Sequence, residues 1–192
     1  MAKRVAHSGE SLLAVAVDVF NVRGYDGTSM EDLAKAAGIT KSSIYHHVTG
    51  KEELLRRAVT RALDGLFGVL EEPGAHEGPA VDRFAYVIGR TCLELVDKLP
   101  YVTLLLRVRG NTATEREALE RRRQFDHRVA DLAAAAIADG DLRADLDPRL
   151  TARLVFGLVN SVVEWYRPDG PDAAPAVAEA LASLVLEGLR PR

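Results

Sequence analysis

The sequence predicts an all-α fold, and three observations support this prediction. Apolar residues recur at three- and four-residue spacing along most of the 192 residues, as they do in helices that bury one face. No segment alternates apolar and polar residues in the manner of a half-buried strand. Glycine and proline residues, which commonly end helices, interrupt the pattern at 71–79, 99–100, 110–111, 140–148 and 167–171.

These breaks divide the chain into about nine predicted helices. A first helix ends before Gly24, and two short helices follow within residues 29–48. The other six are expected at about 51–70, 80–98, 101–109, 114–139, 148–166 and 172–189. We predict two domains, residues 1–50 and 51–192. The first can bury only a thin core by itself, so we expect it to rest on the helix that starts at Lys51.

The second predicted helix begins near Ser29. Thr28 and Ser29 can accept hydrogen bonds from the free amides of a helix start, and Glu31 and Asp32 are placed to act as reciprocal capping-box partners. Gly38 can take the left-handed conformation that ends a helix. Between these ends, apolar residues recur at helical spacing: Met30, Leu33, Ala34 and Ala37.

The third predicted helix, Thr40 to Val48, follows directly after this glycine turn. Thr40 can cap it, while Ile44 and Val48 lie four residues apart and can face inward. Two short helices joined by such a turn form a helix-turn-helix, whose second helix enters the major groove of duplex DNA. The expected DNA contacts are Thr28, Ser29, Lys41, Ser42, Ser43, Tyr45, His46 and Lys51. Of these, Tyr45, His46 and Lys51 suit phosphate oxygens.

The same residues resemble the TetR-type one-component transcriptional regulators. The resemblance covers about residues 8–56 and includes Phe20, Gly24-Tyr25, Thr28-Ser29, Leu33-Ala34, Ala37-Gly38-Ile39, Lys41, Ile44-Tyr45-His46-His47, Lys51-Glu52 and Leu54. Val48 departs from the family pattern, which usually has Phe there, and Ser42-Ser43 replaces a commoner pair containing Gly. The resemblance implies a repressor that binds a palindromic operator as a dimer and is released by a ligand. Activation by ligand-enhanced binding is the alternative.

The net charge of −3 is unfavourable for binding a polyanion, but the local distribution of charge matters more. Lys3, Arg4, Lys35, Lys41 and Lys51 can lie on one side of the DNA-binding module. The acidic excess lies downstream. Arg121 to Arg123 have acidic neighbours, so we interpret this run as a solvated, salt-bridged face and not as a second nucleic-acid site.

The last two predicted helices carry more apolar residues than one buried stripe requires. One face can pack inside the subunit, and the other needs a partner. We predict a two-fold dimer in which this pair meets its copy as a four-helix bundle, through Leu154, Phe156, Leu158, Val162, Leu181, Leu184 and Val185. Such a dimer can hold two recognition helices about 34–36 Å apart, in successive major grooves. A larger monomeric core is the alternative.

We predict that the helices of residues 51–166 enclose a ligand pocket. The candidate lining residues are Leu66, Phe84, Ile88, Cys92, Tyr101, Leu105, Arg107, Phe125, Asn160 and Trp165, although each could simply be core. Arg90, Arg107, Asn160 and Glu164 would need partners if buried, and a ligand could supply one. The lining favours a small apolar or aromatic effector. The segment from Trp165 to Pro171 looks like that of relatives controlling lipid or aromatic-acid breakdown, which implies an acyl-CoA-like effector.

The fold class is therefore all-α, with an N-terminal three-helix helix-turn-helix domain and a C-terminal ligand-binding and dimerisation bundle. Ligand in the bundle would alter the separation or tilt of the two DNA-binding heads. The helix beginning at Lys51 is the expected physical link, because it starts at the DNA-binding module and borders the pocket.

No arrangement of residues indicates catalysis, a metal site or a bound cofactor, so we expect none of these. His46 and His47 are adjacent and point to different faces, which prevents joint metal binding. Cys92 is the single cysteine, and we interpret it as a buried structural thiol and not as a redox sensor. We find no signal peptide and no uncharged segment of about 18 residues, so we expect a cytoplasmic protein with no membrane partner.

Two other classes of function stay open. An all-helical enzyme with a vestigial DNA-binding head would need a catalytic constellation, which the sequence does not show. A DNA-binding protein without an effector would lack a sizeable internal cavity.

We predict that affinity for DNA depends steeply on salt. If about five phosphates are neutralised in each subunit, log affinity falls against log salt with a slope of about −0.9 per phosphate, roughly −9 for a dimer. Fluorescence anisotropy of labelled duplex across a salt series measures this slope. A flat response would contradict the prediction.

Overall fold

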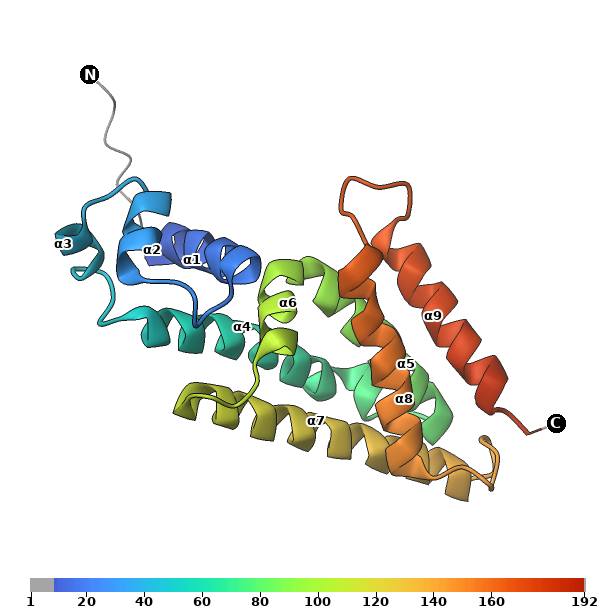
Figure 1. Cartoon of the computed structure of the whole chain (residues 1–192). Helices are drawn as coiled ribbons and strands as arrows, with labels where there is room; N and C mark the ends of the chain where they lie inside the picture. The colour runs from blue at the N-terminus through green and yellow to red at the C-terminus, as the bar shows by residue number, and fades with distance from the viewer. Residues whose placement is uncertain (1–8, 192) are drawn as a thin grey trace. The chain divides into compact units, whose positions relative to one another are not determined.

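The computed structural model describes residues 9–191 and is all-α over this range (Figure 1). The described chain contains nine α-helices, one short 3₁₀ helix and no strand, which confirms the predicted fold class. The elements are α1 (Gly9–Arg23), α2 (Met30–Ala36), α3 (Lys41–Ile44), α4 (Lys51–Glu71), the 3₁₀ helix η1 (Pro73–Ala75), α5 (Ala80–Asp97), α6 (Leu99–Arg107), α7 (Ala113–Ala138), α8 (Pro148–Trp165) and α9 (Ala174–Leu189). The predicted cations Lys3 and Arg4 lie outside the described residues.

The chain packs as two compact units. Unit 1 holds α1 to α3, α4 as far as Arg61, and Pro100–Ala118. Unit 2 holds Ala62–Leu99 and the chain from Leu119 onward. The continuous helix α4 therefore begins in unit 1 and ends in unit 2. The domain division at residue 50 stays a prediction, and these packing units divide the chain differently because α4 adds buried residues to unit 1.

The buried side chains of unit 1 come from α1, α2, α3, α4 and α6, and include Leu12, Val17, Phe20, Leu33, Ile44, Leu54, Leu55, Leu104 and Leu105. Polar contacts join the same helices. Arg61 of α4 pairs with Glu10 of α1 and donates to the Tyr101 hydroxyl of α6 at 2.9 Å. Thr114 of α7 donates to Glu52 of α4 at 2.9 Å. Helix α6 and the start of α7 are thus tied to the helix-turn-helix within one unit.

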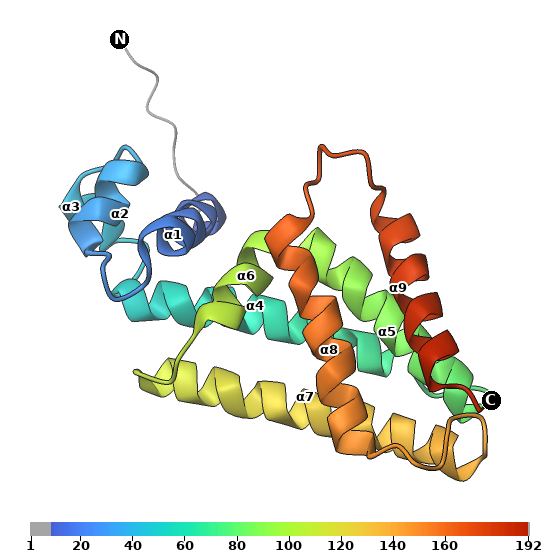
Figure 2. The ribbon, with the colours of Figure 1, turned by 45° about the vertical axis from the view of Figure 1, so that its right-hand side comes forward.

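In unit 2, α8 and α9 both pack against α5 (Figure 2). The ring of Phe125 on α7 meets Phe67 of α4 and Phe156 of α8 edge-on, with ring centroids 5.8 and 5.2 Å apart. Helix α5 contributes a buried apolar stripe of Phe84, Val87, Ile88, Cys92 and Leu95.

Three arginines on α7 in unit 2 form ion pairs: Arg121 with Asp64, Arg123 with Glu120 and Arg128 with Glu71. Arg121 and Arg123 are thus salt-bridged as interpreted. Arg122 between them is half-buried, and burial lowers its pKa, so the run is not solvated throughout. Within residues 9–191, no helix is long and apolar enough to cross a membrane. The same range shows no group of three or more His, Cys, Asp or Glu side chains able to hold a metal ion.

The regular part of α3 is shorter than predicted. The expected helix ran from Thr40 to Val48, whereas α3 ends at Ile44. The amides of His46 and His47 bond to carbonyls three residues earlier, at 3.1 and 3.0 Å, so the chain continues as tight turns. The amide of Val48 still reaches the Ile44 carbonyl at 3.1 Å, which keeps Val48 on the inner face.

Helix α6 begins earlier than predicted, at Leu99 instead of residue 101. Pro100 was interpreted as a break. It lies in the first turn of α6, where the missing amide hydrogen of proline costs nothing because first-turn amides have no partner inside the helix.

An ion pair between the partly buried side chains of Glu72 and Arg90 joins the end of α4 to α5 in unit 2. Arg90 donates two hydrogen bonds of 2.8 Å to the two carboxylate oxygens of Glu72, and the Tyr86 hydroxyl donates a third. Hydrogen bonds from Arg90, with a smaller contribution from Tyr86, outweigh partial burial and lower the pKa of Glu72 to about 2. Gly74 lies against the Tyr86 ring, where an added Cβ would come within 2.6 Å of ring carbons.

We predict that Glu72→Gln destabilises unit 2 in a pH-dependent way. The folded pKa of about 2 lies below the usual 4.5, so the contribution of the Glu72 carboxylate is fully present above pH 4.5 and is lost as the pH falls towards 2. The melting temperature should fall by about 2–4 °C for each kcal/mol lost at pH 7. The difference from wild type should shrink below pH 4.5.

Glu179→Gln on α9 is the matched control for this prediction, because Glu179 is exposed. Thermal melts across pH measure both variants. An offset for Glu72→Gln that stays constant with pH would contradict a role for the charged carboxylate.

Candidate DNA-binding surface

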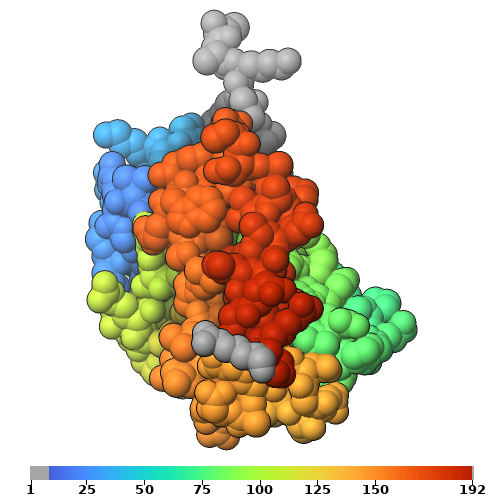
Figure 3. Space-filling model, turned by 90° about the vertical axis from the view of Figure 1, so that its right-hand side faces the viewer, coloured from blue at the N-terminus to red at the C-terminus, as the bar shows by residue number. Residues whose placement is uncertain are grey.

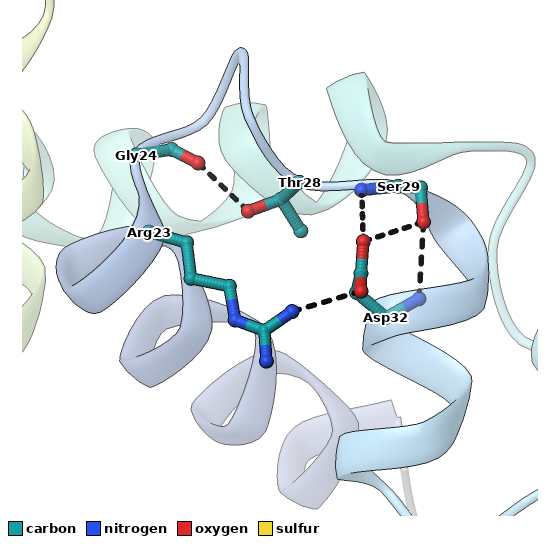
Figure 4. A network of polar contacts seen from close by, with 5 residues as sticks. All are labelled: Arg23, Gly24, Thr28, Ser29 and Asp32. Carbon is teal, nitrogen blue, oxygen red and sulfur yellow. Dashed lines mark hydrogen bonds and ion pairs between the residues drawn. The ribbon is translucent and has the colours of Figure 1, made fainter.

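The start of α2 is fixed by a network of polar contacts (Figure 4). Ser29 caps the helix as predicted: its hydroxyl accepts the Asp32 amide hydrogen at 3.1 Å, and its own amide donates to Asp32 at 2.9 Å. Hydrogen bonds from the hydroxyl and amide of Ser29 lower the pKa of Asp32. Arg23, at the end of α1, binds the other oxygen of Asp32 at 2.8 Å.

Thr28 serves the fold and does not present its side chain to solvent. It is 2% exposed, and its hydroxyl donates to the Gly24 carbonyl at 2.7 Å (Figure 4). The structure therefore corrects the predicted DNA contact by the Thr28 hydroxyl, because the α1–α2 turn encloses it. Ser29 is exposed, but its hydroxyl is engaged with Asp32 at 2.6 Å.

Helix α3 presents a polar outer face over two buried apolar residues. Thr40 caps it by accepting the Ser43 amide hydrogen at 3.1 Å. Ile44 and Val48 are 0% and 3% exposed, which confirms that they face inward. The exposed side chains on the other side are Lys41, Ser42, Tyr45 and His46, with Ser43 half-buried. The predicted contact residues of α3 are thus gathered on one accessible face, and their contacts with DNA stay predictions.

Lys51 holds the loop between α1 and α2. Its ammonium donates to the main-chain oxygens of Tyr25 at 3.0 Å, Thr28 at 3.0 Å and Asp26 at 3.4 Å. It also lies 4.4 Å from the centre of the Tyr25 ring. An ammonium has three donors, so these carbonyls engage all of them. A phosphate contact, as predicted for Lys51, would have to replace some of these bonds.

Two residues that the sequence did not single out shape this surface. Arg23 steadies Asp32, as described above. Glu53 accepts hydrogen bonds from the amide and hydroxyl of Thr49, at 2.6 and 2.8 Å, and these bonds lower its pKa. The usual capping-box spacing would have suggested Glu52, which instead accepts from Thr114.

The predicted pocket residues are divided between the two units. Tyr101, Leu105 and Arg107 belong to unit 1, whereas Leu66, Phe84, Ile88, Cys92, Phe125, Asn160 and Trp165 belong to unit 2. In unit 2, Phe84, Ile88, Cys92 and Phe125 are buried, and Leu66 and Asn160 are half-buried. Arg90, for which a ligand was one possible partner, is paired with Glu72. The contacts of these residues with a ligand stay a prediction.

Helices α8 and α9 lie side by side in unit 2 (Figure 3). They carry an exposed apolar stripe. Leu154, Leu158 and Leu184 are 65%, 38% and 67% exposed, and Leu150 and Trp165 join them. Trp165 therefore lies on this surface, where it lines the groove described next, and its contact with a ligand stays a prediction. A groove of about 500 Å³ runs between the two helices.

The other four predicted dimer residues are buried within the chain: Phe156, Val162, Leu181 and Val185. Phe156 faces inward and contacts Phe125, so the structure corrects its assignment. Val162 and Leu181 line the groove between α8 and α9, and their part in a dimer stays a prediction.

Comparison with known proteins agrees with this geometry. Residues 12–58 match the family model described as bacterial regulatory proteins, tetR family, and residues 77–189 match the model described as tetracyclin repressor-like, C-terminal domain. The chain belongs to the TetR family. The first match covers all of α2 and α3, and the second covers α5 to α9, so the family accounts for both the DNA-binding face and the helical bundle.

Relatives and solved structures match over nearly the full length. The HTH-type transcriptional repressor KstR2 of Rhodococcus jostii is 31% identical over 93% of this chain and 89% of the relative. A TetR-family regulator from Streptomyces coelicolor A3 superimposes with a TM-score of 0.90 at 61% identity, over 99% of this chain and 94% of that one. The ketosteroid transcriptional regulator KstR2 of Mycobacterium tuberculosis gives 0.87 at 26% identity, over 100% and 99%.

This TetR-family chain is a DNA-binding transcriptional regulator and not an enzyme. The exposed face of α3 is the surface that the helix-turn-helix geometry assigns to DNA.

We predict that Lys51→Met weakens DNA binding without changing its dependence on salt. Loss of the ammonium frees the α1–α2 loop, so the melting temperature should fall together with the affinity. A lost phosphate contact would instead reduce the magnitude of the salt slope by about 0.9 per subunit.

Lys41→Met is the matched control, because Lys41 is exposed on α3 and holds no loop. It should leave the melting temperature unchanged. A reduced slope with an unchanged melting temperature for Lys51→Met would show that Lys51 acts on phosphate.

Proposed function

We propose that this chain is a ligand-responsive repressor that binds a palindromic operator as a homodimer and is released by a small effector. One observation carries the DNA-binding part of the proposal. Lys41, Ser42 and Tyr45 project from α3, while Ile44 and Val48 beneath them are buried. Base contacts would come from Lys41, Ser42 and Ser43, and phosphate contacts from Tyr45 and His46. Such a regulator would act in the cytoplasm, where operator DNA is accessible.

The exposed stripe on α8 and α9 supports the homodimer. Large apolar side chains that are half or more exposed are costly when several share one surface, and this favours a partner that covers them. Leu150, Leu154 and Leu158 are spaced four residues apart and so share one face of α8, beside Leu184 of α9. A two-fold axis through this surface would bring four helices together and give a closed assembly.

An effector of largely apolar character fits unit 2. The buried stripe of α5 is apolar except for Thr91, which is 2% exposed. The Thr91 hydroxyl oxygen is buried without a hydrogen-bond partner among the described residues. A bound molecule with one polar group could supply that partner. The relative from Mycobacterium tuberculosis is described as a ketosteroid regulator, which supports a similar apolar class of effector, with aromatic and acyl-CoA-like compounds as further candidates.

Helix α4 supplies the proposed link between effector and DNA. It runs unbroken from Lys51, which holds the α1–α2 loop, to Glu71 in unit 2. A change at its far end can therefore be transmitted along one rigid element to the DNA-binding helices. A coupling free energy of about 1–3 kcal/mol, typical of such linkage, changes operator affinity roughly 5- to 150-fold.

We predict that substitutions on α3 separate sequence preference from general affinity. Lys41→Ala and Ser42→Ala should change which genomic fragments the protein retains, because these side chains would meet base edges. Tyr45→Ala should weaken retention of all fragments alike, because its hydroxyl would meet phosphate.

Sequencing of the retained fragments measures both effects. Arg123→Ala in unit 2 serves as the control that removes a charge away from α3. An unchanged sequence preference in Lys41→Ala would contradict the proposed docking of α3.

We predict that the double substitution Leu154→Glu and Leu184→Glu yields a folded monomer with weakened operator binding. Both side chains are about two-thirds exposed, so the charges are tolerated within one chain and unfavourable in an apolar interface. Sedimentation at micromolar concentration measures the mass. Gln124→Glu is the control that adds a charge elsewhere in unit 2, since Gln124 is exposed on α7. Sedimentation of the wild-type protein as a monomer would contradict the proposed homodimer.

A further inference from the structure

Unit 1 contains a cleft whose lining includes no residue of α2 or α3. Its volume is about 680 Å³, within the usual range of small-molecule sites. One wall is the end of α1 with the α1–α2 loop, Asn21–Gly27, and the other is the end of α6 with the segment that follows, Leu106–Arg109. Phe20, Leu55 and Leu104 form an apolar floor, and Asn111 and Glu115 close one side.

Two guanidinium groups face this cleft without a carboxylate partner. Arg107 donates to the main-chain oxygen of Asn21, which is neutral. Arg109 lies two residues beyond and is exposed. Neither arginine forms an ion pair with any residue in the part of the chain that the structure describes, although many arginines there do, such as Arg61 and Arg121.

The two carboxylates of the lining are already satisfied by hydrogen bonds. Glu115 is 5% exposed and accepts from the amides of Asn111 and Thr112, at 2.5 and 3.3 Å. Asp26 accepts from the Asn111 side chain at 3.0 Å. These bonds do not neutralise the two carboxylates, but they leave Arg107 and Arg109 as the lining residues whose charges no carboxylate holds, and guanidinium groups suit carboxylates in particular.

Apolar surface lies next to these cations. Val22 is 85% exposed, and Leu106 is half-buried. A ligand that contacts both the arginine cations and the apolar surface carries a carboxylate on a small apolar group.

We propose that this cleft binds a small organic anion, with Arg107 and Arg109 holding its carboxylate and Val22 and Leu106 contacting its apolar part. The site lies within the DNA-binding unit and is separate from the effector site proposed in unit 2.

The cleft is connected to the helix-turn-helix through Arg23. This arginine lies in the lining, and its guanidinium binds Asp32, which in turn holds the amide and hydroxyl of Ser29 at the start of α2 (Figure 4). An anion in the cleft attracts Arg23 away from Asp32 and so loosens the support of the α2 cap. Occupancy therefore lowers affinity for DNA.

Benzoate is the probe, and benzamide is its neutral counterpart of the same shape. Calorimetry without DNA should show benzoate binding to the full-length protein with a dissociation constant of about 1 mM, as expected for a ligand of this size. Benzamide should not bind. Shifts of backbone amide NMR signals on adding benzoate should include Gly24, Gly27 and Asn111.

Arg109→Gln should weaken benzoate binding by about tenfold or more, because it removes a charge-assisted contact. Arg123→Gln, which removes an arginine charge in unit 2, should bind as wild type does. Equal binding of benzamide, unchanged affinity in Arg109→Gln, or shifts confined to unit 2 would each overturn the proposal.

A second measurement tests the link to DNA. Benzoate should lower the affinity of wild type for a retained genomic fragment by about fivefold or more, and leave that of Arg109→Gln unchanged. An equal loss in both proteins, or no loss in wild type, would overturn the coupling through Arg23. Because benzoate binding is measured without DNA, its failure is distinct from a failure of the proposed repressor function.

Discussion

The DNA-binding surface depends on the contacts that α3 makes with the rest of unit 1. A helix of four residues has almost no stability of its own, because the cost of forming the first turn is repaid only by packing or by further turns. Here the burial of Ile44 and Val48 supplies the packing, and Thr40 caps the first amides. The inner face of α3 is fixed by packing, and this sets which side chains form its polar outer face. The buried residues Ile44 and Val48 therefore determine which residues of α3 are accessible to DNA.

The α1–α2 loop is the second support, and two charged groups hold it. Asp32 binds Ser29 and Arg23 at one end, and the Lys51 ammonium binds three carbonyls of the loop. Lys51 is also the first residue of α4. The helix that continues into unit 2 therefore begins with the side chain that organises the DNA-binding unit. This arrangement would give the effector proposed in unit 2 a physical route to DNA affinity, and the cleft in unit 1 lies beside the same loop.

Local features could be predicted from the sequence, and features set by distant partners could not. The Ser29 and Thr40 caps and most helix spans were predictable, since they depend on neighbours within a few residues. Leu154 and Phe156 are both apolar and two residues apart, and only packing shows that Leu154 faces outward and Phe156 inward. The role of Lys51 depends on carbonyls more than twenty residues earlier in the chain. The division of the candidate pocket residues between the two units could not be predicted either, because apolar spacing does not tell which unit a helix segment joins.

The central claim is that α3 enters the major groove twice, from two subunits related by a two-fold axis. Hydroxyl-radical footprinting of a retained genomic fragment at low ionic strength tests this most directly. Two protected patches are expected on one face of the duplex, with centres about 34–36 Å apart. Absence of any protected site, or a single patch without a symmetric partner, would contradict it.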